Sequence, residues 1–126
     1  MTIGDTIGTY GDRTPGIFFH SDSSTLSICN AVNGNGNHCY NGATVSLNKW
    51  TQIKVTQEKI ETKSKLKAQY NYSIVIGDVS KYNVINKQAK TFENVYAYSG
   101  APTTPALASL TGLTIKLTGN TRENLI

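Results

Sequence analysis

The chain has 126 residues, of which 38% are hydrophobic and 16% charged, and its formal net charge is +4. This composition indicates one globular, β-rich domain and excludes a disordered or coiled-coil chain. No apolar run approaches the ~20 residues that span a bilayer, so we expect no membrane insertion. Residues 1–12 do not resemble a signal peptide, so the signal of a secreted protein would have to lie outside this sequence.

Short strands separated by turn residues are predicted in the first third of the chain. After a short strand over residues 2–7, the sequence predicts strands over 16–20 and 25–32. The segment 33–37, NGNGN, is the clearest hairpin signal, because Asn and Gly tolerate left-handed backbone conformations. The return strand is expected over residues 38–41.

The central hairpin has the strongest pattern. Residues 51–57 alternate, with Ile53 and Val55 on one face, and residues 69–76 alternate in the same way. Trp50 leads the first of these runs, and we expect it to pack against the sheet.

Three more strands are predicted towards the carboxyl end, over residues 79–85, 92–98 and 110–117. In the first of them, Val79 and Tyr82 are the expected apolar anchors. Together the strands predict an all-β fold, a single antiparallel β-sandwich. This domain is expected to cover residues 1–118, with residues 119–126 as a frayed tail.

Cys29 and Cys39 lie symmetrically about Gly34, so a tight hairpin would place them opposite each other at disulfide distance. Two free buried thiols in a reducing compartment remain the alternative. A metal site is less favoured, because His38 adds only a third ligand to the two cysteines.

The chain resembles the laminin G-like members of the concanavalin A-like lectin and glucanase superfamily. The resemblance covers nearly the whole chain and rests on packing and turn motifs at residues 10–20, 27–39, 47–57, 70–78, 92–99 and 110–117. It implies a jelly roll of two antiparallel sheets. Such domains usually begin with earlier strands, so this chain looks short at its amino end. An incomplete sheet edge would recruit another copy or a strand-donating partner.

The glucanase branch requires closely spaced carboxylates on one strand face. No two acidic residues here stand at positions i and i+2, and the nearest pair, Glu58 and Glu61, flanks a lysine-rich tip. Cys39 and His38 would point to opposite faces of a strand. We therefore expect no enzymatic activity.

The resemblance implies ligand sites as well. A basic patch for sulfated glycans would use Lys63, Lys65 and Lys67, which alternate along a hairpin arm, although a solvated loop is the favoured interpretation because exposed charge runs are common. A calcium ion at the rim would use Asp12, Asp22 or Asp78, and no other cofactor is expected.

Other contacts are expected from loops and rings. The sheet face or the loops at residues 33–37 and 99–109 are the expected contact surfaces, and Asn35, Asn37 and Tyr98 are candidate ligand-binding residues. Sugars could stack on the rings of Tyr10, Tyr40, Tyr96, Tyr98 and Trp50, but packing is the favoured use of Trp50. Asn71 begins the sequon Asn-Tyr-Ser on the polar face of its strand, where a glycan would be tolerated.

The preferred function is a non-catalytic, extracellular recognition or adhesion module that binds carbohydrate or a glycosylated partner. The alternative is a structural subunit of an extracellular assembly that self-associates through its sheet edge. Nucleic-acid binding is disfavoured by the modest charge and the lack of an RNA- or DNA-binding motif.

Overall fold

The computed structural model describes residues 2–4, 13–61, 67–89 and 96–98, and these residues form strands and turns without any helix. No described helix is available to cross a membrane. The strands are β1 (Thr2–Gly4), β2 (Arg13–Phe19), β3 (Thr25–Val32), β4 (Asn35–Thr44), β5 (Ile53–Ile60), β6 (Gln69–Ile76), β7 (Val79–Asn86) and β8 (Tyr96–Tyr98).

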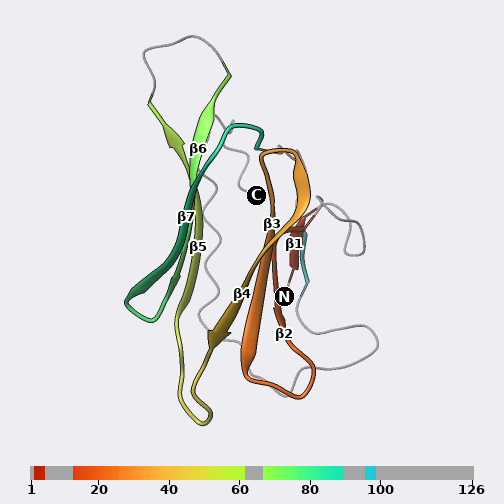
Figure 1. The fold of residues 1–126 in the computed structure, drawn as a ribbon, viewed down its shortest axis with the longest axis vertical. Coiled ribbons are helices and arrows are strands. Elements are labelled where there is room, and N and C mark those ends of the chain that lie inside the picture. Colours follow the sequence, from red (N-terminus) through yellow and green to blue (C-terminus); the bar gives the residue numbers. More distant parts are fainter. Residues whose placement is uncertain (1, 5–12, 62–66, 90–95, 99–126) are drawn as a thin grey trace.

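The strands form two antiparallel sheets that face each other (Figure 1). One has the order β4-β3-β2-β1-β8 and the other the order β5-β6-β7. Each sheet is built from hairpins between consecutive strands, and β8 returns to pair with β1. The prediction of an all-β fold with antiparallel sheets is thus confirmed, whereas its assignment as a jelly roll remains a prediction.

Two of the predicted strands have the predicted bounds. β3 covers residues 25–32 and β6 covers residues 69–76. β6 pairs antiparallel with β5 over its whole length, from Ile53 opposite Ile76 to Ile60 opposite Gln69. The predicted central hairpin is therefore confirmed, because strict alternation fixes both the strand and its inward face.

Strand ends differ from the predictions where turns are tighter than expected. Only Asn33 and Gly34, with φ of 49° and 82°, form the turn after β3, so β4 starts at Asn35 and not at residue 38. β4 also continues to Thr44. The strand expected over residues 51–57 lies at Ile53–Ile60 instead. The predicted strand over residues 110–117 lies outside the described residues.

The core lies between the sheets. The first sheet contributes Leu26, Ile28, Val32 and Ala43, and the second contributes Tyr72, Ile74 and Ile76. Each large buried side chain stabilises the folded state by roughly 1.5–3 kcal/mol relative to its exposed form. Removal of these side chains from water is what holds the two layers together.

The expectation for Val79 is wrong. This side chain is 56% exposed, because Val79 begins β7 directly after the two-residue turn at the end of the sheet. Tyr82, the second expected anchor, does pack against the core. Its hydroxyl lies 2.6 Å from Nε2 of His38 on β4, so this pair joins an edge strand of one sheet to an edge strand of the other.

Asparagines join the sheets where β3 turns into β4, near the end of β7 (Figure 1). Asn86 is fully buried, and its Nδ2 donates 2.9 Å hydrogen bonds to the carbonyl oxygen of Ala31 and to Oε1 of Gln57. Nδ2 of Asn33 donates to the carbonyl oxygen of Ile85 at 2.9 Å. The hairpin signal at residues 33–37 therefore also encodes the attachment of one sheet to the other.

Candidate functional site

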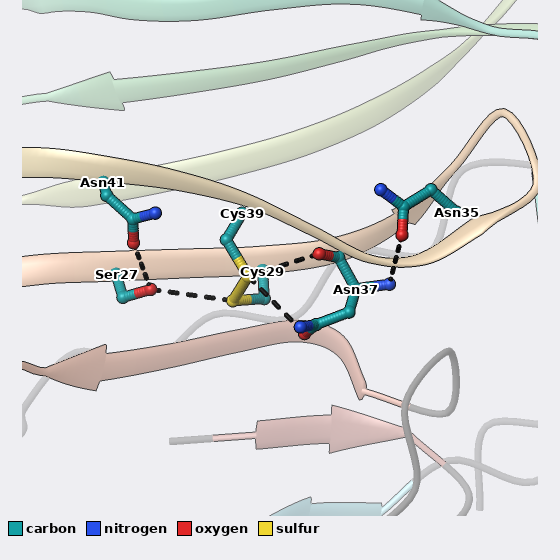
Figure 2. The surroundings of a disulfide bond; sticks show 6 residues. All are labelled: Ser27, Cys29, Asn35, Asn37, Cys39 and Asn41. Atoms are coloured by element: carbon teal, nitrogen blue, oxygen red, sulfur yellow. Dashed lines mark hydrogen bonds between the residues drawn. A yellow bond between two sulfur atoms is a disulfide. The ribbon is translucent and has the colours of Figure 1, made fainter.

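Cys29 and Cys39 form a disulfide across the β3–β4 hairpin (Figure 2). The two residues are direct partners in the register, with their Cα atoms 4.0 Å apart. The prediction of a cross-strand disulfide is thus confirmed, and the alternatives of free thiols and of a metal site with His38 are excluded for this pair. A disulfide indicates an oxidising setting.

Asn35 and Asn37 are exposed on β4 but participate in local structure. Oδ1 of Asn35 accepts a 3.0 Å hydrogen bond from the backbone amide of Asn37. The side chain of Asn37 lies against the disulfide, with its Oδ1 3.5 Å from Sγ of Cys39 (Figure 2). These contacts order the start of β4. The third candidate ligand-binding residue, Tyr98, lies in β8.

The lysine arm is only partly described. Lys67 is exposed immediately before β6, whereas Lys63 and Lys65 lie outside the described residues. Their joint projection from one face remains a prediction.

Asn71 lies on β6, the central strand of its sheet, opposite Glu58 on β5 and Ile85 on β7. The neighbouring Tyr72 is buried in the core, so alternation directs Asn71 to the outer face of the sheet. The side chain is half-buried by its flanking strands. Glycosylation of Asn71 remains a prediction.

Trp50 does not pack against the sheet, contrary to expectation. Because β5 begins only at Ile53, Trp50 belongs to the connection between the sheets, and it is 68% exposed. Leu47 in the same connection is 78% exposed. The sequence predicts Trp50 as the first residue of a strand. The polar residues Asn48 and Lys49 directly before it are the signal in the sequence that the turn continues to this point.

This connection, residues 45–52, is fixed at both ends by backbone hydrogen bonds. The amide of Val45 donates to the carbonyl oxygen of Ser24 in the β2–β3 turn at 3.0 Å. The carbonyl oxygen of Gln52 accepts from the amide of Gly77 in the β6–β7 turn at 2.8 Å. The connection is therefore attached to one turn of each sheet.

We call this part of the molecule the Trp50 end: residues 21–24, 45–52 and 77–79. It lies in the lower part of Figure 1. Asp22 and Asp78 are exposed here on the two anchoring turns, and Lys49 is exposed beside Trp50. The Trp50 end thus combines one open aromatic ring with polar and charged groups on three segments.

No match to this chain was found among protein-family models, curated proteins or solved structures. The resemblance to laminin G-like domains accordingly remains a prediction that rests on the sequence motifs alone.

The calcium site that this resemblance implies remains a prediction. Asp22 lies in the β2–β3 turn and Asp78 in the β6–β7 turn, while Asp12 lies outside the described residues. In the described segments no three His, Cys, Asp or Glu side chains are grouped as metal ligands would be, so an ion at either aspartate would need backbone carbonyl oxygens or waters as its other ligands.

Proposed function

We propose that this chain is a non-catalytic, extracellular recognition module that binds carbohydrate or a glycosylated partner. The observation that supports it is an open tryptophan ring on a connection attached to both sheets. A preorganised loop loses little conformational entropy on binding, so its exposed groups can contribute their full contact energy.

Two further features support the proposal. The disulfide between Cys29 and Cys39 is typical of a protein that works outside the reducing cytosol. The resemblance to laminin G-like domains favours a jelly-roll fold and a contact function. The proposal does not require calcium.

The test is a glycan array probed with the purified, disulfide-bonded protein, together with a hydrolysis assay on the glycans that it retains. We expect retention of a subset of glycans and no release of reducing sugar. Retention of no glycan would contradict carbohydrate recognition, and sugar release would contradict a non-catalytic role. Concentration-dependent assembly without glycan binding, measured by solution scattering, would favour the alternative structural subunit.

A further inference from the structure

We propose that the indole of Trp50 is the stacking platform for a neutral pyranose ring, so that glycans bind at the Trp50 end and not beside Lys67 at the other end of the β5–β6 hairpin. This inference rests on the proposed function and names its contact residue and ligand class. It follows from the exposure of the ring, the fixation of its connection and the charges around it.

The exposure of Trp50 is not required by the fold. Tryptophan is usually well buried, and removing an indole from water is strongly favourable. Here the core is completed by Ile53 and Val55 of β5, which pack against it, while Trp50 stays in solvent three residues earlier. An aromatic face left open in this way is available to a ligand that has an apolar face of its own.

The connection that presents the ring is well defined. Its ends are attached to Ser24 and Gly77, and Asn48 adopts a left-handed backbone conformation with φ of 56° just before Lys49 and Trp50. Asn tolerates this conformation better than most residues. The backbone that carries the ring is therefore fixed to the end of the two-layer structure before any ligand arrives.

A pyranose matches this arrangement chemically. Its axial C–H groups form an apolar face that can lie against the electron-rich face of an indole, while its hydroxyls point outwards around the ring. Exposed groups at the Trp50 end can accept or donate hydrogen bonds to such hydroxyls, among them the carboxylates of Asp22 and Asp78 and the side-chain amide of Asn48.

The charges near the ring are of both signs and do not single out an ionic ligand. The Trp50 end carries two carboxylates, Asp22 and Asp78, and the ammonium group of Lys49, and two further lysines, Lys54 and Lys81, are exposed at the adjoining starts of β5 and β7. No field of one sign is present here to attract a sulfated or sialylated glycan or an anionic lipid surface, so we infer a neutral sugar. Anionic ligands would instead be attracted to the opposite end, where Lys67 is exposed.

Trp50 is the only tryptophan in the chain, so its fluorescence reports on the proposed contact directly. The intact protein is titrated with lactose, cellobiose and maltose as neutral probes and with a heparin-derived tetrasaccharide as the anionic probe. At least one neutral probe should shift the emission to the blue and protect it from acrylamide quenching. Because stacking is not an ion pair, raising the salt concentration should leave this binding unchanged.

Matched variants locate the contact. Trp50→Ala should weaken retention of neutral glycans roughly tenfold or more, and Trp50→Phe should keep part of it. Ile85→Ala removes an exposed apolar side chain outside the Trp50 end, and Lys67→Glu changes the opposite end. Both should bind within about twofold of the original protein. Thermal unfolding followed by circular dichroism verifies that each variant is folded.

The outcomes separate this inference from the proposed function. If Trp50→Ala retains neutral glycans normally, or if only sulfated glycans bind and Lys67→Glu releases them, the inference is overturned while glycan recognition stands. A blue shift with phosphatidylcholine vesicles and with no sugar also overturns it, in favour of a lipid contact. If the original protein retains no glycan on the array, the proposed function itself fails.

Discussion

The backbone amide of Asn33 donates a 3.0 Å hydrogen bond to the side-chain oxygen of Asn86, which lies 53 residues further along the chain. The side-chain oxygen of Asn33 in turn accepts a 2.7 Å bond from the amide of Lys87. Asn86 thus accepts from a backbone amide of the β3–β4 turn, and Asn33 accepts from a backbone amide directly after β7. These bonds connect the β3–β4 turn to the last residues of β7, and so connect the two sheets.

Replacing Asn86 should therefore destabilise the whole domain. Asn86→Ala would remove the Nδ2 group that donates to the carbonyl oxygen of Ala31 and to Oε1 of Gln57, and we expect a loss of roughly 2–4 kcal/mol in the free energy of unfolding. Asn83→Ala, at an exposed position of the same strand, is the control and should change stability by less than about 0.5 kcal/mol. Urea unfolding measures both, and equal effects would contradict this role of Asn86.

Tyr72 presents the opposite case, a buried polar atom without a partner. Its side chain is 1% exposed, and its hydroxyl has no hydrogen-bond partner in the described part of the chain. Tyr72→Phe removes only this hydroxyl, so at neutral pH it should leave stability unchanged or raise it by up to about 1 kcal/mol. A loss above about 1 kcal/mol in urea unfolding would indicate a hydrogen bond, for example to an internal water molecule.

The same residue predicts the response to alkaline pH. Burial, and to a smaller extent the charge of Tyr82, raise the pKa of Tyr72 above its ordinary value of 10.0. Above pH 10 the unfolded chain therefore loses a proton that the folded protein keeps, and stability falls as the pH rises, by up to about 1.4 kcal/mol per pH unit from this group. Tyr72→Phe should have a shallower decline above pH 10 in the same unfolding assay. Parallel declines for the two proteins would contradict the assignment.

The tight turn after β3 predicts an effect of backbone conformation. Gly34 has φ of +82°, and Gly34→Ala should cost roughly 1–2 kcal/mol because a Cβ atom disfavours this region. The added Cβ would also lie 2.9 Å from Oε1 of Gln88, a flexible side chain that can move aside. Gly77→Ala, with φ of +61° and no atom within 4 Å of its Cβ, is the matched control. Similar losses for both variants would attribute the cost to φ, whereas a much larger loss at Gly34 would show that Gln88 is held in place.

The sequence predicted those parts of the fold that short-range pattern determines. Residues 69–76 alternate so regularly that both the bounds and the buried face of β6 follow from them. The prediction that Trp50 packs against the sheet is wrong. An aromatic residue before alternating positions is equally compatible with the first residue of a strand and with the last residues of a turn. The placement of the residues around Trp50 depends on hydrogen bonds to Ser24 and Gly77, which are distant in sequence and leave no local signal.

Long-range polar contacts could not be predicted from the sequence for the same reason. Asn86 lies where the sequence shows only the end of a strand, and its burial results from partners on β3 and β5. The segment before residue 38 predicts the hairpin turn, but it gives no local sign that its asparagines also order the start of β4. In the structure Asn35 and Asn37 organise the start of β4, a role that depends on the hairpin register and on the neighbouring disulfide.

The disulfide itself gives the last prediction. Cys29 and Cys39 are 10 residues apart, so the bond closes a small loop within one hairpin. By the chain-entropy estimate for such a loop, its removal should lower the free energy of unfolding by roughly 2–3 kcal/mol. The double variant Cys29→Ala/Cys39→Ala should therefore unfold at a lower temperature, and a reductant should destabilise the original protein but not this variant. Because the Trp50 end is joined to the sheets by backbone bonds and not by the disulfide, the folded double variant should still retain neutral glycans. If reduction abolished glycan binding at temperatures where the domain stays folded, the contact would have to lie on the β3–β4 hairpin and not at Trp50.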